Sequence, residues 1–148
     1  MKMLTRRRLL LGGGKKSLYV YEPGYTEWKN ATEKYKGSTV TKTLDGSADS
    51  AKIENSDGLT GTYSIQINEA TYKNYSKLVM VASISDASVV RVAYWGSSYI
   101  STTDAVKFAG LTKSKATYEL DITSYSGTRY LQFQLGKAVI SIYDIHFE

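Results

Sequence analysis

The sequence contains no cysteine, one proline and one histidine among 148 residues. The absence of cysteine excludes a disulfide framework, a thiolate metal site and a thiol nucleophile. The single histidine, His146, is too little for a histidine-rich metal site, and we expect it to be structural, not a general base. The sequence holds no run of about 20 apolar residues, so no membrane-spanning helix is expected.

Tyrosine, glycine, serine and threonine are abundant. The chain has 13 tyrosines and 12 glycines, and 42% of its residues are hydrophobic. β-Branched and aromatic side chains suit a pleated, half-buried surface, so this composition favours short strands over long helices. The length and the hydrophobic fraction are those of one domain with one core. We therefore expect a single all-β domain with an extension.

Positive charge is concentrated at the start of the chain. The formal net charge is +5, and residues 1–17 hold six lysines and arginines with no acidic residue. In residues 18–148 the other 13 basic residues are offset by 14 acidic residues. A nucleic-acid-binding domain normally spreads its cations over one face, where they follow the phosphates. The near-neutral body therefore argues against nucleic acid as a partner.

The segment LTRRRLLLGGGKKS, Leu4 to Ser17, fits neither an export signal nor a phosphate loop. A secretory signal needs about 7 to 15 apolar residues, and this run has three leucines. A phosphate loop needs a glycine where Leu9 stands and a serine or threonine where Lys16 stands. We interpret residues 1–17 as a basic, glycine-hinged arm and residues 18–148 as the folded domain. The alternative is a disordered terminus. The residues expected to dock the arm into a partner are Arg6, Arg7, Arg8, Leu9, Leu10 and Leu11.

Alternation of apolar and polar residues, interrupted by turn residues, predicts a series of half-buried strands. Residues 25–36 are irregular, and we expect a helical turn around residues 27–35. Turn signals stand at Pro23-Gly24, Asp45-Gly46 and Asp57-Gly58. The expected strands are 18–22, 38–44, 51–54, 62–68, 77–85, 88–95, 116–122, 129–135 and 138–148.

Two short connections predict how some of these strands meet. Segments 77–85 and 88–95 are the most apolar, and only Asp86-Ala87 separates them, so we expect a central antiparallel pair. Gly136-Lys137 is expected to turn a tight hairpin. Eight or nine strands at this spacing predict a two-sheet antiparallel β-sandwich of jelly-roll type, with an extended basic N-terminal arm.

Both ends of the chain carry a resemblance. The stretch YELDITSYSGTRYLQFQLGKAVISIYDIHFE, Tyr118 to Glu148, resembles the C-terminal end of galactose-binding-like jelly rolls, the fold of many carbohydrate-binding modules. The stretch RRRLLLGGGKKSLYVYEPG resembles the start of small structural proteins of tailed bacteriophages and prophages. These resemblances imply a capsid- or tail-associated module that attaches to a virion or recognises a host-surface glycan. They also imply localisation to the virion after synthesis in the bacterial cytoplasm.

A glycan site needs aromatic rings for the C–H faces of the sugar and polar groups for its hydroxyls. We look for these aromatics off the strands, in loops at the ends of the sandwich. Trp95-Gly-Ser-Ser-Tyr99 is the preferred position, because an aromatic stands at each end of a small polar turn. The alternative is that Trp95 closes the core and Tyr99 covers an edge. The candidate glycan-binding residues are Trp95, Tyr99, Tyr25, Trp28 and Tyr125.

No cofactor or metal is expected. Some jelly rolls of the kind that the chain resembles hold a structural calcium, which takes six to eight oxygen ligands. The oxygen-rich residues Asp45, Asp49, Asn55 and Asp57 have no recognisable calcium spacing. We interpret them as turn formers.

We do not expect an enzyme. A glycosidase needs two acids about 5 to 10 Å apart, and Asp121 and Asp144 are the pair to consider, but each stands where strand-end acids cap turns. The main hypothesis is a non-enzymatic bacteriophage virion protein whose arm docks into other virion proteins and whose domain serves assembly or host contact. The alternative is a lectin-like module that binds polysaccharide. Fibre and tail proteins of this kind are often symmetric, so a homo-oligomer is expected.

Overall fold

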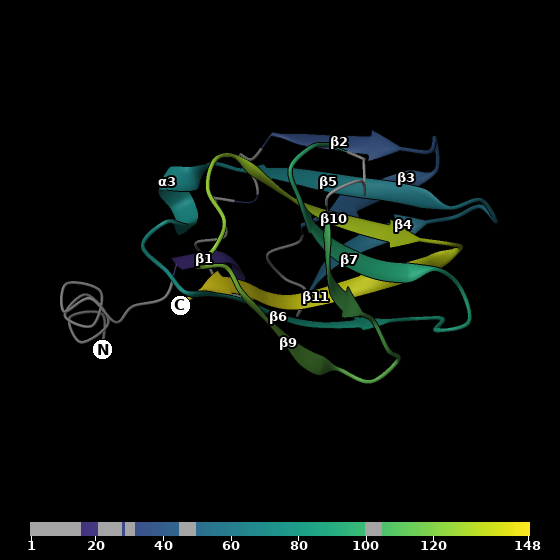
Figure 1. Ribbon diagram of the computed structural model, residues 1–148. Coiled ribbons are helices and arrows are strands. Elements are labelled where there is room, and N and C mark those ends of the chain that lie inside the picture. Colours follow the sequence, from purple (N-terminus) through teal and green to yellow (C-terminus); the bar gives the residue numbers. More distant parts are fainter. Residues whose placement is uncertain (1–15, 21–27, 29–31, 45–49, 100–104) are drawn as a thin grey trace.

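The fold is an all-β sandwich of two antiparallel sheets (Figure 1). The computed structural model describes residues 16–20, 28, 32–44, 50–99 and 105–148, so the arm residues Arg6 to Leu11 lie outside the described part. One short helix, α3, spans Glu69–Tyr72. The strands are β1 Lys16–Val20, β2 Glu33–Lys36, β3 Val40–Thr43, β4 Ala51–Asn55, β5 Gly61–Ile67, β6 Lys77–Ile84, β7 Arg91–Gly96, β8 Val106–Gly110, β9 Ala116–Asp121, β10 Arg129–Leu135 and β11 Ala138–Phe147.

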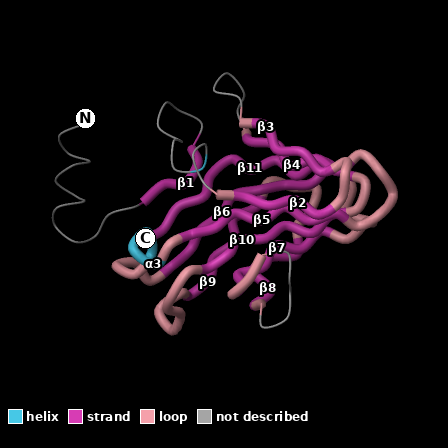
Figure 2. Tube along the Cα trace, turned by 90° about the horizontal axis from the view of Figure 1, so that it is seen from above, coloured by secondary structure: helices cyan, strands magenta, loops and turns pink. Residues whose placement is uncertain are grey.

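The two sheets differ in strand order. The six-stranded sheet has the order β3-β4-β11-β6-β9, and β1 pairs with the C-terminal part of β11. The five-stranded sheet has the order β2-β5-β10-β7-β8. Figure 2 shows the two layers from above, with the C-terminus and α3 at the end of the sandwich where β1 lies. The sequence prediction of a two-sheet antiparallel sandwich is confirmed.

Most connections between successive strands cross from one sheet to the other. β2 passes to β3 through residues 37–39, where Gly37 has a φ of +101°, a left-handed value that favours glycine. β10 passes to β11 through Gly136-Lys137. The predicted tight turn is therefore confirmed, but the expected hairpin is not formed, because the turn joins two sheets.

The expected pairing of segments 77–85 and 88–95 is wrong. β6 lies between β11 and β9 in the six-stranded sheet, whereas β7 lies between β10 and β8 in the other sheet. The connection is also longer than expected, because Val89 and Val90 belong to it and not to β7. Asp86 shapes this connection by accepting hydrogen bonds from the amide and hydroxyl of Ser88 at 2.9 and 2.6 Å. Apolar alternation reports a buried face, but it does not identify the neighbouring strand.

Three short strands also differ from the sequence predictions. β1 begins at Lys16, so the last two residues assigned to the arm are strand residues. β2 forms at residues 33–36, where a helical turn and irregular chain were expected. β8 was not expected at all, because VKFAG lacks a clean alternation. Each of these strands is short and lies beside a longer strand that supplies its hydrogen bonds.

Alternate residues of both sheets fill the interior. The largest fully buried side chains include Trp28, Trp95, Tyr63, Tyr72 and Phe133. In β11 the inward positions change from Ile140 and Ile142 to Ile145 and Phe147, because the register shifts between Ile142 and Asp144. Such a bulge inserts one residue and moves the following side chains to the opposite face. β11 therefore contributes side chains to the core both before and after the bulge.

Candidate functional site

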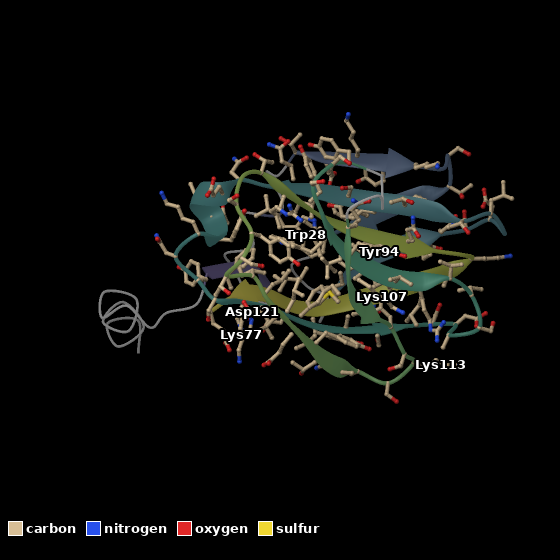
Figure 3. All side chains as sticks on the ribbon, in the orientation of Figure 1. Trp28, Lys77, Tyr94, Lys107, Lys113 and Asp121 are labelled. Atoms are coloured by element: carbon tan, nitrogen blue, oxygen red, sulfur yellow. The ribbon has the colours of Figure 1, made fainter. Side chains whose placement is uncertain are left out.

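The outer face of the five-stranded sheet carries a row of polar and aromatic side chains. Their inward neighbours on the same strands, such as Phe133 and Trp95, are fully buried, so the row points away from the core. The strand registers align one residue from each strand, in the order Lys34, Ser64, Gln132, Tyr94 and Lys107. Figure 3 labels Tyr94 and Lys107, which lie on the neighbouring strands β7 and β8. We call this surface, together with Tyr99, the tyrosine–glutamine face.

The segment after β7 folds back over part of this face. The amide of Gln132 donates a hydrogen bond to the carbonyl oxygen of Ser98 at 2.8 Å. The hydroxyl of Tyr99 donates to Oε1 of Gln66 at 2.9 Å. The ring of Tyr99 lies 4.3 Å from the ring of Tyr130, measured between centroids. Tyr99 is thus held against β5 and β10 by a hydrogen bond and a ring contact.

The Tyr99 hydroxyl keeps its proton, as its hydrogen bond to Gln66 requires. Burial raises the pKa of its hydroxyl, and the neighbouring Tyr130 adds to the rise. The phenol therefore remains neutral and keeps the proton that it donates to Gln66. The Nζ atom of Lys34 lies 4.5 Å from the centroid of the Tyr99 ring, within the range of a cation–π interaction.

Exposure divides the face into a covered centre and an accessible surround. Ser64 and Gln132 are fully buried, so neither offers its side chain to a ligand. Lys34 and Lys107, at the two ends of the row, are exposed. The half-buried residues of the face are Gln66, Tyr94, Tyr99, Tyr130 and Gln134. A ligand on this face therefore meets mainly tyrosine rings and glutamine amides.

This set of groups suits a ligand that is rich in hydroxyls. A tyrosine ring gives apolar contact area, and the ring orders at low entropic cost because it has few rotatable bonds. A glutamine amide both donates and accepts hydrogen bonds, as a sugar hydroxyl does. The registers pair a ring with an amide twice here, Tyr130 with Gln66 and Tyr94 with Gln132.

Tyr99 is the predicted glycan-binding residue that the structure places on this face. The prediction that Trp95 and Trp28 present their rings to a sugar is wrong, because both side chains are 0% exposed. Trp95 packs edge-on against Tyr72 at 5.4 Å, and the indole of Trp28 donates to the hydroxyl of Tyr63 at 2.6 Å. The alternation of β7 sends Trp95 inward and Tyr94 outward.

The two other predicted tyrosines are not part of the face. Tyr125 is half-buried in the turn between β9 and β10, 4.7 Å from the guanidinium carbon of Arg129. Its ring also lies 6.5 Å from that of Trp95, so it covers one end of the core. Tyr25 lies outside the described residues.

Sequence analysis missed the strand residues of the face. Gln66, Tyr94, Tyr130 and Gln134 were passed over because the search was confined to loops. The signal was present in segments such as RYLQFQL, where tyrosine and glutamine occupy the outward positions of an alternating strand. Outward positions on an antiparallel sheet are usually polar, so the tyrosine rings at these positions are the informative feature.

The acidic pair considered for a glycosidase does not come together. Hydrogen bonds from the hydroxyl and the amide of Thr123 lower the pKa of Asp121, whereas a general acid requires a raised one. Through Val81 of β6, the strand registers align Asp144 of β11 with Thr117 of β9. Asp121 lies four residues beyond Thr117, which adds about 13 Å along the strand direction at the usual rise. The interpretation of Asp121 as a turn-capping residue is confirmed. The same interpretation is wrong for Asp144, which lies inside β11 and contacts His146.

His146 has a structural environment. It is 4% exposed, with Nδ1 at 2.9 Å from Oδ2 of Asp144 and Nε2 at 3.0 Å from Oε2 of Glu148. Each ring nitrogen thus contacts one carboxylate, that of Asp144 in β11 or that of Glu148, the next residue after β11. This agrees with the structural role expected from the sequence.

The residues weighed as calcium ligands take part in a turn where they are described. The amide of Asn55 donates to the carbonyl oxygens of Leu59 and Leu135 at 2.7 and 3.0 Å, and Asp57 accepts from the amide of Leu59 at 2.9 Å. Asp45 and Asp49 lie outside the described residues. Within the described part, no three histidine or acidic residues are placed to hold a metal ion. Likewise, no helix in that part has the length and apolar character needed to cross a membrane.

Comparison with known proteins places the fold. No protein-family model matches the chain, and no curated protein is similar to it in sequence. A mutant of CBM29-2 from carbohydrate-binding module family 29, complexed with cellulohexaose, has a TM-score of 0.61 at 15% identity over 90% of this chain and 89% of that chain. Another CBM29-2 mutant, complexed with mannohexaose, has a TM-score of 0.57 at 13% identity over 90% of this chain and 89% of that chain.

A bacteriophage protein is also similar in fold. The enzymatically active domain of tailspike protein 4 of Bacteriophage CBA120 matches with a TM-score of 0.55 at 10% identity, over 86% of this chain and 20% of that chain. At such low identities the similarity is one of fold. The chain therefore shares the β-sandwich of carbohydrate-binding modules, as the galactose-binding-like resemblance led us to expect.

Proposed function

We propose that the domain is a non-catalytic carbohydrate-binding module that holds a polysaccharide on its tyrosine–glutamine face. The observation that carries this proposal is the sharing of one sheet face by half-buried tyrosines and glutamines. The similarity to modules complexed with cellulohexaose and mannohexaose supports it. The proposal favours the lectin-like alternative over the virion role that was the main sequence hypothesis.

The dimensions of the face favour an extended ligand. The row from Lys34 to Lys107 crosses five neighbouring strands, and four strand spacings make about 19 Å. A single sugar would contact only part of such a row. We therefore expect an oligosaccharide to bind more tightly than the corresponding monosaccharide.

Replacing Tyr94 with alanine tests the proposal. The change removes a half-buried ring from the face while leaving the inward side of β7 intact, so we expect glycan binding to weaken about 2- to 10-fold. Affinity electrophoresis in gels containing a panel of soluble polysaccharides, including glucans, mannans and polyuronates, would measure this change.

The matched control is Thr117→Ala, which lies on the outer face of the other sheet. This variant should migrate as the parent does in every gel. Equal retention of the parent, Tyr94→Ala and Thr117→Ala in every gel would rule out the tyrosine–glutamine face as the binding site.

Attachment to a bacteriophage particle is a second candidate function, favoured by the similarity to the tailspike domain. β1 begins at Lys16 beside Phe147 in the six-stranded sheet, so residues 1–15 join the domain on the sheet opposite the tyrosine–glutamine face. Attachment and recognition would then use different sheets. The virion partners, the virion location and the homo-oligomer stay predictions.

Deleting residues 1–14 separates the two functions, because it leaves β1 intact. We expect the shortened chain to keep its glycan retention, and a virion role predicts that it is no longer incorporated into particles. Electrophoretic retention and immunodetection in purified particles measure the two effects. Normal incorporation of the shortened chain would contradict the role assigned to the arm.

A further inference from the structure

We propose that the polysaccharide bound on the tyrosine–glutamine face is acidic, carrying carboxylate or sulfate groups along its chain. This inference rests on the proposed carbohydrate-binding function and names the chemical class of the ligand. The outward-facing charges of the two sheets are the basis for it.

The outer face of the five-stranded sheet is basic. Lys34 and Lys36 of β2 and Lys107 of β8 are exposed at its outward positions. The strands of this sheet contain a single carboxylate, that of Glu33. Glu33 points to the interior, where it accepts hydrogen bonds from Lys42 and Tyr63, so it does not neutralise the outer lysines.

The outer face of the six-stranded sheet has the opposite balance. Its cations are Lys52 and Lys77 of the strands and Lys115, whose Nζ atom lies 4.3 Å from the centroid of the Tyr143 ring. Acids outnumber them, and Lys77 pairs with Glu119 at 3.4 Å. The acidic side chains at outward positions of its described strands are Glu54, Glu119, Asp121 and Asp144. The outer faces of the two sheets therefore differ in their balance of charge, and the basic one carries the tyrosines and glutamines.

The lysines of the basic face are available to a ligand. Lys36 and Lys107 form no ion pair with any described residue. Lys34 interacts with the ring of Tyr99 through its cation, which leaves its ammonium group without a counter-ion in the described part of the chain. At physiological salt, charges interact over about 8 Å, so each lysine acts on the groups of a ligand that lie close to it.

The spacing of these charges suits a repeating acidic chain. Lys34 and Lys107 stand at opposite ends of the aligned row, about 19 Å apart by strand spacing. The rings that a ligand can reach near them are those of Tyr99, beside Lys34, and Tyr94, which is paired with Lys107. An acidic polysaccharide offers anionic groups at intervals and sugar faces in between. A nucleic acid, with a charge on every phosphate, requires a denser track of cations than the few lysines here.

A chemically matched pair of polymers tests the inference. Polygalacturonate and its methyl-esterified form share one backbone and differ in charge. We expect the full chain to be retained by polygalacturonate in affinity electrophoresis, and about 2- to 5-fold less by the methyl ester. Retention by polygalacturonate should fall to the level of the ester at about 0.3 M salt, because the ions screen exposed charges.

Lysine-to-glutamine variants show which face produces the preference for polygalacturonate. Lys36→Gln combined with Lys107→Gln should weaken polygalacturonate retention about 2- to 5-fold without changing retention by neutral glycans. Lys52→Gln, which removes one charge from the opposite face, should leave both unchanged. Deletion of residues 1–14 in a parallel sample should preserve the preference, which separates the face from the basic arm.

The outcomes distinguish this inference from the function on which it rests. Equal, salt-independent retention by the charged and esterified polymers would overturn the acidic ligand and leave a neutral-glycan module. Stronger retention by single-stranded DNA than by polygalacturonate would also overturn it. If no polysaccharide of the panel retains the chain, the proposed carbohydrate binding fails and the inference fails with it.

Discussion

The Trp95→Ala variant is expected to lose about 3–5 kcal/mol of unfolding free energy, because it truncates a fully buried tryptophan. The Trp95 ring packs against Tyr72 at 5.4 Å, Phe147 at 6.3 Å and Tyr125 at 6.5 Å. These neighbours come from α3, from β11 and from the turn before β10. Removing the ring therefore leaves a cavity where both sheets and the helix meet.

Urea denaturation followed by tyrosine fluorescence or circular dichroism would measure this loss. Trp95→Phe serves as the second variant, because it keeps a ring in the core and removes an indole N–H that has no hydrogen-bond partner among the described residues. We expect it to cost roughly 1 kcal/mol. An exposed sugar-binding role for Trp95 would instead give near-normal stability and lost glycan binding for the alanine variant.

The second large effect concerns the edge where β2 and β3 face each other across the two sheets. Lys42 donates to Glu33 Oε2 at 2.7 Å, and Tyr63 donates to the same oxygen at 2.5 Å. Tyr35 donates to Oε1 of Glu33 at 2.9 Å, and Trp28 donates to the hydroxyl of Tyr63. The carboxylate thus joins both sheets at this edge.

We expect Glu33→Ala to lower the unfolding free energy by about 2–4 kcal/mol. The side chain of Lys42 is only 10% exposed, and the variant leaves its ammonium and the Tyr63 hydroxyl without their acceptor. Urea denaturation at neutral pH measures the loss. Glu54→Ala, at an exposed outward position of β4, is the control and should change stability by less than about 0.5 kcal/mol. A similar loss in both variants would remove the special role of Glu33.

The same carboxylate predicts a pH dependence. Burial raises the pKa of Glu33, but hydrogen bonds from Lys42, Tyr63 and Tyr35 and the charge of Lys42 outweigh it, so the net pKa lies below its ordinary value of 4.5. Because the pKa of Glu33 is lower in the folded than in the unfolded chain, its ionised carboxylate stabilises the fold at pH values above the unfolded pKa. This stabilisation is lost as the pH falls through the folded pKa.

Comparing the parent with Glu33→Gln across this acid range isolates the contribution of Glu33. The parent should lose stability more steeply than the variant as the pH falls below about 4.5, because the variant has no proton to bind at this position. Parallel stability curves for the two proteins would show that Glu33 does not contribute to the acid transition.

The local alternation of the sequence predicted much of the architecture. Segments such as TYSIQIN and RYLQFQL were placed within one residue of β5 and β10, because inward apolar and outward polar residues alternate there without interruption. β8 and β2 were missed because VKFAG and EKYK lack that pattern. Glu33 in particular faces inward, where hydrogen bonds from Lys42 of β3 and Tyr63 of β5 stabilise its carboxylate.

The candidate site was less accessible to sequence analysis. Trp95-Gly-Ser-Ser-Tyr99 was the preferred position because an aromatic stands at each end of a small polar turn, yet Trp95 belongs to the core, as does Trp28. The alternation in RVAYW separates Tyr94 from Trp95, but it does not state which of the two faces solvent. That choice depends on the second sheet, which covers Trp95.

The sequence by itself determined an all-β chain with a basic start and a near-neutral body, because composition and local alternation are properties of neighbouring residues. Only the tertiary structure decided that Lys34, Ser64, Gln132, Tyr94 and Lys107 form one row. It also decided that the exposed lysines Lys34, Lys36 and Lys107 lie on one outer face and that the acids Glu54, Glu119, Asp121 and Asp144 lie on the other. The physical reason is that strand pairing is made by backbone hydrogen bonds between distant segments, which carry no signature in the local order of side chains.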